Sequence, residues 1–224
     1  MKATTAVALA IAACATPFVA TTTLAQPSAS AAQKGDPRQF DIAGVMIGMS
    51  PVEARAALKA RGYAVGADNT DKSDYHALLT KKLREREPSL PYASEGIHIR
   101  HFSGEGPAGE QVIVSFSETP SGNRVSEVSL SLNSNRIDAS RMRGDVMAKY
   151  GKPTIARDSL GSTWWCRSSE TRCDRVGYTD TVLEFSDVAG VTLRLVDDNR
   201  MRRETDTAIA AEVERRYPRR AANF

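Results

Sequence analysis

Two neighbouring segments alternate between apolar and small polar residues, and this pattern constrains the fold more than any other. Residues 111–118 place Val112, Val114 and Phe116 on one face of a strand and Ile113, Ser115 and Ser117 on the other. Residues 128–133 repeat the alternation with valine and leucine against serine and asparagine, and the turn-forming TPSGN at 119–123 separates the two runs. We therefore expect an antiparallel hairpin with its branched and aromatic face buried and its serine-lined face in water.

Residues 50–61 carry the start and stop signals of a helix. Ser50 can cap the first turn, Pro51 suits the first helical position, and Glu53 can complete a capping box. Gly62 follows the alanine-rich stretch and can adopt the left-handed conformation that ends a helix. We predict a helix over these residues, with Ser50 and Glu53 as its cap.

Further helices and strands follow in a repeating order. Helices are predicted over about 73–86, from 138 or 140 to 150, and over about 204–217; strands are predicted over 98–102, 163–166, 182–185 and 191–196. Helices followed by strands, twice, predict an α+β fold with helices packed on antiparallel sheet. The similar segments ARGY at 60–63 and AKYG at 148–151 favour two tandem helix-plus-sheet units, 40–134 and 135–224, the second including the C-terminal helix.

The N-terminus has the layout of a secretory signal peptide. Lys2 precedes the apolar run at 6–13, and Leu24 and Ala25 provide a small-residue exit, which predicts cleavage before Gln26. An alternative is that IAAC at 11–14 is a lipobox and that Cys14 carries a lipid. Residues 26–39 are expected to be a flexible linker, because they are rich in Ala, Ser and Pro. The protein is accordingly expected in the periplasm or outside the cell.

Only two cysteines remain after removal of the signal, Cys166 and Cys173. In an oxidising compartment they are expected to form a disulfide across a hairpin. The alternative is a metal site, but these cysteines lack the close spacing of metal ligands and have no nearby histidine. The formal net charge of +3 is too small to argue for nucleic-acid binding.

Residues 44–53 (GVMIGMSPVE) resemble the opening segment of small bacterial envelope domains whose helix starts at a GMS motif. These are the SmpA/OmlA-type outer-membrane lipoproteins and the β-lactamase-inhibitor-protein-like repeats. The GKP sequence at 151–153 is similar to the GxP that often follows a helix in these domains. The resemblance implies helices packed against a small antiparallel sheet, in tandem units in the second group, and a function in protein binding.

Motifs of catalysis are not evident. The chain has no G-x-S-x-G, and Gly161-Ser162-Thr163 is not a nucleophile elbow. The pair His98 and His101 is expected to be incidental rather than a metal site, and Asp197-Asp198 is expected to cap the final helix. Cys166 could act as a nucleophile only if it were unpaired. We predict no enzymatic activity and no cofactor, with an uncharacterised hydrolase as an alternative.

Two surface features are candidates for partner binding. Trp164 and Trp165 point to opposite faces of a strand, so one could be exposed as an interface anchor; alternatively both are buried, or the disulfide packs over one. The C-terminal arginines are Arg200, Arg202, Arg203, Arg215, Arg216, Arg219 and Arg220. They could contact anionic lipid or an acidic partner, but interleaved acidic residues favour a solvated helix with local ion pairs.

These observations predict a non-catalytic protein-binding module whose partner is another envelope protein. An envelope assembly or structural factor, lipidated on Cys14, is the alternative. Nucleic acid is not an expected partner. Membrane contact is expected only through a lipid or the arginine-rich C-terminus.

Overall fold

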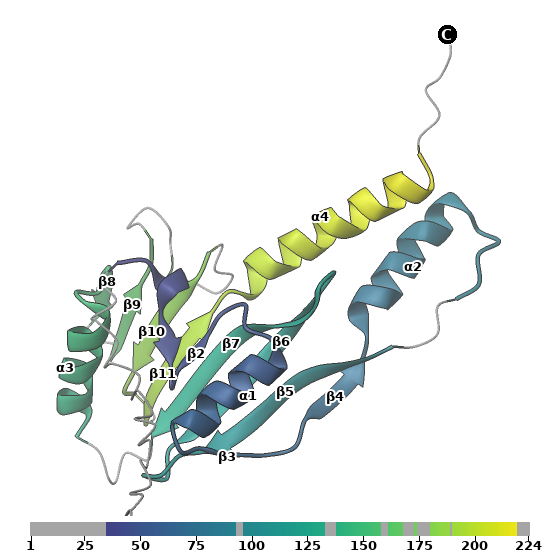
Figure 1. The fold of residues 1–224 in the computed structure, drawn as a ribbon. Helices are drawn as coiled ribbons and strands as arrows, with labels where there is room; N and C mark the ends of the chain where they lie inside the picture. Colours follow the sequence, from purple (N-terminus) through teal and green to yellow (C-terminus); the bar gives the residue numbers. More distant parts are fainter. Residues whose placement is uncertain are drawn as a thin grey trace, which may run out of the picture. The chain divides into compact units, whose positions relative to one another are not determined.

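A computed structural model of the chain describes residues 35–92, 96–132, 138–157, 161–167, 173, 180–188 and 190–218. The predicted signal peptide, Cys14 and most of the predicted linker lie outside these residues. The described part belongs to one compact unit that spans residues 31–224. Its fold is α+β, with helices packed on a large antiparallel sheet (Figure 1).

The helices are η1 (a 3-10 helix, Pro37–Gln39), α1 (Pro51–Ala60), α2 (Asp74–Arg86), α3 (Ala139–Tyr150) and α4 (Asp198–Arg216). The strands are β1 (Asp41–Ile42), β2 (Val45–Met46), β3 (Ala64–Val65), β4 (Asn69–Lys72), β5 (Ile97–Glu105), β6 (Gln111–Thr119), β7 (Gly122–Leu132), β8 (Ile155–Arg157), β9 (Ser162–Trp165), β10 (Val182–Ser186) and β11 (Val191–Val196). β1 and β2 form a small hairpin. The other strands form a nine-stranded sheet in the order β3-β5-β6-β7-β11-β10-β9-β8, and β4 pairs with β5.

The predicted hairpin is the centre of this sheet. β6 pairs with β7, and the side chains of Val112 and Val114 are fully buried while Phe116 is 6% exposed. β11 pairs with the other edge of β7, so strands from both predicted units belong to one continuous sheet.

The predicted caps of α1 are present. The backbone N–H of Ser50 donates to Glu53 Oε2 at 2.7 Å, and the N–H of Glu53 donates to Ser50 Oγ at 3.4 Å. Gly62 has φ +82°, the left-handed conformation that ends the helix. The helix-start prediction is therefore confirmed.

One face of the sheet carries the main core. α1, α3 and the β1–β2 hairpin contribute to it, and Figure 1 shows α1 and β2 in front of the strands. Tyr150 Oη at the end of α3 donates to the carbonyl of Asp41 at 2.5 Å. Trp165 Nε1 donates to the carbonyl of Gly151 at 2.9 Å, so the end of α3 is fixed to both β1 and β9.

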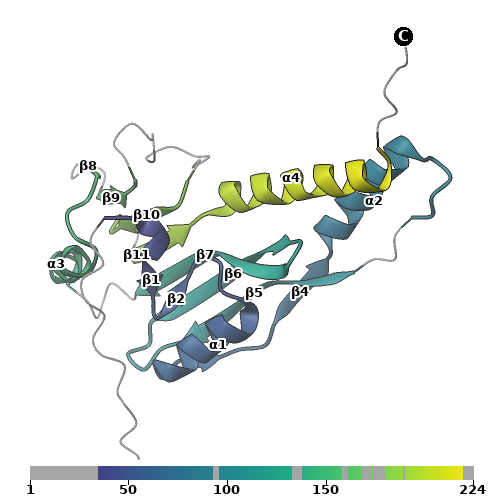
Figure 2. The ribbon, with the colours of Figure 1, turned by 45° about the horizontal axis from the view of Figure 1, so that its top comes forward.

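α2 and α4 form a separate helix pair with its own small core of Leu79, Leu83, Ile209 and Val213. Both helices run away from the sheet in the same direction (Figures 1 and 2). α4 begins at Asp198 rather than near residue 204, because Met201 and Thr205 continue its buried stripe toward the sheet.

Candidate functional site

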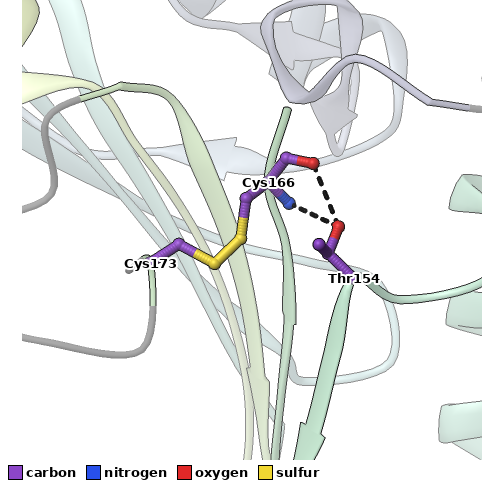
Figure 3. Close-up of a disulfide and its surroundings, with 3 residues drawn as sticks. All are labelled: Thr154, Cys166 and Cys173. Carbon is purple, nitrogen blue, oxygen red and sulfur yellow. Dashed lines mark hydrogen bonds between the residues drawn. A yellow bond between two sulfur atoms is a disulfide. The ribbon is translucent and has the colours of Figure 1, made fainter. Parts of the chain in front are cut away.

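The disulfide is present. Cys166 and Cys173 are bonded, with their Cα atoms 6.3 Å apart. Thr154 Oγ1 accepts from the backbone N–H of Cys166 and donates to its carbonyl, both at 3.0 Å (Figure 3). The bridge is compatible with an oxidising, exported location. Because its sulfur is bonded, Cys166 does not offer the free thiol that a nucleophile requires. Residues 168–172, which would form the predicted hairpin turn, lie outside the described part.

Both tryptophans are buried, so of the two alternatives for Trp164 and Trp165 the structure shows burial and not an exposed partner-binding anchor. Trp165 is 2% exposed and belongs to the main core, whereas Trp164 is 6% exposed and packs on the opposite face of the sheet. The neighbours of Trp164 include both cysteines of the disulfide. The alternation of β9 therefore points the rings to opposite faces as predicted, and the second ring is buried in the cluster that contains the Cys166–Cys173 disulfide.

The second face of the sheet, opposite the main core, is lined largely by small polar side chains. Cross-strand pairing connects Ser103 to Ile113, Ile113 to Ser129, and Ser129 to Arg194. These four residues form one row across the strands, and parallel rows of cross-strand partners lie on either side of it. We name the following side chains of these rows the serine face: His101, Ser103, Glu105, Gln111, Ile113, Ser115, Glu127, Ser129, Ser131, Thr192 and Arg194.

Ile113 is the apolar side chain at the middle of the serine face. It is 46% exposed, whereas its chain neighbours Val112 and Val114 on the opposite face are fully buried. Ser103, Gln111 and Ser131 around it are also exposed. An isoleucine in an otherwise serine-bearing alternation was visible in the sequence, but it was not identified there as a binding residue.

Arg194 and Glu127 of the serine face carry opposite charges and form hydrogen bonds to each other. Arg194 Nε and Nη2 donate to the two carboxylate oxygens of Glu127 at 2.7 and 2.9 Å. Such a bidentate pair holds both side chains in one geometry. Cross-strand pairing continues from Arg194 to Glu184 and then to the buried Trp164. The serine face therefore ends on that side at the cluster that contains Trp164 and the disulfide.

A polar cluster joins α2 to the sheet. Glu118 of β6 accepts from Ser73 Oγ at 2.6 Å and from the backbone N–H of Tyr75 at 3.0 Å. His98 Nδ1 lies 4.0 Å from Glu118 Oε2. The serine hydroxyl therefore bonds to the carboxylate and not to the imidazole, unlike the serine–histidine contact that activates a nucleophile. This arrangement fixes the start of α2.

Asp197 does not cap α4 through its side chain, which corrects the expectation from the sequence. The residue is 2% exposed, and its Oδ2 accepts from Thr181 Oγ1 at 2.9 Å and from Arg200 Nε at 2.6 Å. Burial raises the pKa of Asp197, against the opposing effect of Arg200 and Thr181. Asp197 thus joins the start of α4 to the residue before β10.

The arginines of α4 make local ion pairs, as expected for a solvated helix. Arg215 and Arg216 both bond to Glu212, at 2.7 and 2.6 Å. Arg200 bonds to Glu204 at 2.8 Å, in addition to Asp197. Arg219 and Arg220 lie outside the described residues.

Comparison of the chain with family models, with curated proteins and with solved structures finds no match. The resemblance of residues 44–53 to the envelope domains therefore stays a prediction. Within the described ranges, no group of three or more His, Cys, Asp or Glu side chains is arranged to hold a metal ion. No helix of the described chain is long and apolar enough to cross a bilayer.

Proposed function

We propose that the mature chain is a non-catalytic protein-binding module of the periplasm or the extracellular space, and that the serine face contacts its partner. The observation that carries this proposal is the exposure of Ile113, 46%, at the middle of a sheet face with small polar neighbours. The partner we expect is another envelope protein.

The side chains of the serine face suit a protein contact. Serine hydroxyls can both donate and accept hydrogen bonds, and ordering them costs little conformational entropy because the side chains are short. A central apolar side chain with a polar surround matches the usual division of an interface into core and rim. The backbone of the paired strands fixes the positions of these side chains, so binding needs little reorganisation of the surface.

Three features of the described chain support a non-catalytic function over the hydrolase alternative. The Cys166 sulfur is bonded to Cys173. The hydroxyl of Ser73 is engaged by Glu118, and the Ser73 residue is 4% exposed. The two histidines of this cluster do not pair their rings with the hydroxyl in its hydrogen bonds: His76 bonds to Ser73 Oγ through its backbone N–H at 3.2 Å, and His98 Nδ1 lies 4.0 Å from Glu118 Oε2.

Site-directed photocrosslinking tests the proposal. A photoreactive amino acid replaces Ile113 in the exported protein, and the crosslinked products from the native envelope are identified by mass spectrometry. Val52 on α1 is 78% exposed and serves as the control position. We expect one partner protein crosslinked from position 113 and absent from position 52.

A blocking substitution completes the test. Ile113→Arg should abolish binding of the partner so identified, since a long cation would replace the apolar contact, while Val52→Arg should leave binding intact. Equal binding by both variants, with both proteins folded by circular dichroism, would exclude the serine face as the contact surface.

A further inference from the structure

A pocket with a volume of about 680 Å³ lies along α2, on a different part of the molecule from the serine face. Its lining includes Lys72, His76, Lys81 and Arg84, and Tyr92 and Gly96 form part of its opposite wall. This volume is within the range of small-molecule sites.

The positive charge of Arg84 is held in place without being neutralised. Its guanidinium lies over the ring of Tyr92, 3.9 Å from the centroid, and Nη1 donates to the carbonyl of Leu90. A ring and a carbonyl carry no formal charge. The cation is therefore fixed in position by neutral groups and keeps its capacity to pair with an anion.

Lys81 adds a second cation one helical turn away from Arg84. Among the described residues no carboxylate forms an ion pair with either side chain. Glu85 is the acidic side chain of the lining, and it pairs with Lys82 at 3.0 Å. Two like charges at i and i+3 on one helix repel each other, so an anion between them would relieve an unfavourable interaction.

Gly96 allows the opposite wall to approach α2 closely. A Cβ atom at this position would lie 3.0 Å from the Cβ of Ser73 and 3.2 Å from Cδ2 of His76. A larger residue would therefore push the wall away from the helix. Tyr92 is 81% exposed, so its ring supports Arg84 while the entrance remains accessible to solvent.

We propose that this pocket binds the phosphate or carboxylate group of an anionic ligand, with Lys81 and Arg84 as the charged donors. Arg84 supplies a planar fork of donors that matches the oxygens of either group, and Lys81 supplies a point charge beside it. The neutral contacts that hold Arg84 reduce the entropy lost on binding. The same chemistry would serve a free anion or a lipid headgroup.

Two binding measurements on the mature chain test the proposal and separate the two sources. The first is a titration with inorganic phosphate against chloride at constant ionic strength, followed by NMR shifts of the α2 amides. The second is sedimentation with vesicles of phosphatidylglycerol, with phosphatidylcholine vesicles as the neutral comparison. Lys81→Gln and Arg84→Gln remove the proposed donors. Lys59→Gln makes the same change of charge on the exposed surface of α1.

We expect Lys81→Gln and Arg84→Gln each to weaken binding by roughly tenfold, the usual order for loss of one charge-assisted hydrogen bond. Lys59→Gln should leave binding unchanged.

Saturable phosphate binding with this dependence on the two variants would support a free-anion site. Binding to the anionic vesicles alone, with the same dependence, would support a lipid headgroup. The proposal is overturned if neither probe binds, or if Lys81→Gln binds as the unmodified protein does. Lys81→Gln keeps the test valid if Arg84→Gln fails to fold, because no hydrogen bond or ion pair to another described residue depends on the Lys81 ammonium.

Discussion

Removal of the Cys166–Cys173 bridge should destabilise the fold in two separable parts. The cysteines are 7 positions apart, and loop closure over so short a segment contributes about 2.4 kcal/mol through the entropy of the unfolded chain. Reduction removes this contribution but leaves both sulfurs in place. Substitution by alanine also removes the sulfurs from their packing around Trp164.

The second part follows from burial. Cys166 is 5% and Cys173 is 1% exposed. A sulfur is comparable in size with a methylene group, so each loss costs roughly 1 kcal/mol. We therefore expect reduction to cost about 2.4 kcal/mol and the double substitution to alanine to cost about 4 kcal/mol. Both losses are smaller than the usual stability of about 5–15 kcal/mol, so the reduced protein and the variant should both fold in the absence of urea.

Urea unfolding at neutral pH measures both quantities. The oxidised protein, the reduced protein and the double alanine variant are compared by tryptophan fluorescence, with thiol content determined by mass. The variant in the presence of reductant is the control, and its midpoint should not move. The reasoning is refuted if full reduction leaves the free energy of unfolding unchanged, or if the reduced protein and the variant are equally stable.

Three further predictions concern the ends of helices and the N-terminus. Ser50→Ala should lower the free energy of unfolding by about 0.5–2 kcal/mol in a urea melt and leave partner binding intact; an unchanged melt would exclude the cap. Burial raises the pKa of Asp197, so its stabilising contribution is present at low pH and is lost as pH rises through the folded-state pKa. Asp197→Asn should therefore gain stability relative to the unmodified protein as pH rises in urea melts, whereas parallel pH curves would contradict this. Intact mass of the exported protein should place its N-terminus at Gln26, and a lipid on Cys14 would instead support the envelope assembly factor.

Local patterns predicted the parts of the fold whose causes are local. The capping box at Ser50 and Glu53 places the start of α1 at Pro51, because each group of the box bonds within the same turn. The alternation around the turn at 119–123 predicted β6 and β7, since their period and the turn residues agree. These elements need no distant contact to specify them.

Short strands were missed because they carry no pattern. β3 has two residues and β4 has four, all exposed in β4, so neither shows the alternation of a half-buried strand. Both are recruited by pairing with β5, which is a tertiary event. The early start of α4 has a similar cause, because Met201 is buried only after the helix packs against the sheet.

The candidate surfaces were predictable in different degrees. The wet serine face followed from the alternation, and Ile113 was placed on it by the same pattern. The alternation of β9 left the burial of Trp164 open as one of two alternatives, because the residues clustered with it come from the disulfide and from neighbouring strands. The pocket beside α2 was also not predicted from the sequence. Its opposite wall at Tyr92 and Gly96 is positioned by contact with the helix, and no local pattern specifies that contact.

The position of β11 has a consequence for the order in which the chain folds. β7 is complete at Leu132, but its second neighbour, Val191–Val196, is the last strand in the described part of the chain. β8, β9 and β10 reach β7 only through β11. Until residue 196 has been synthesised, the edge of β7 opposite β6 is unpaired, and such edges promote association with other chains. A chain with this topology therefore depends on the late strand β11 to close an edge that forms early, so folding before residue 196 is available exposes it to association with other chains.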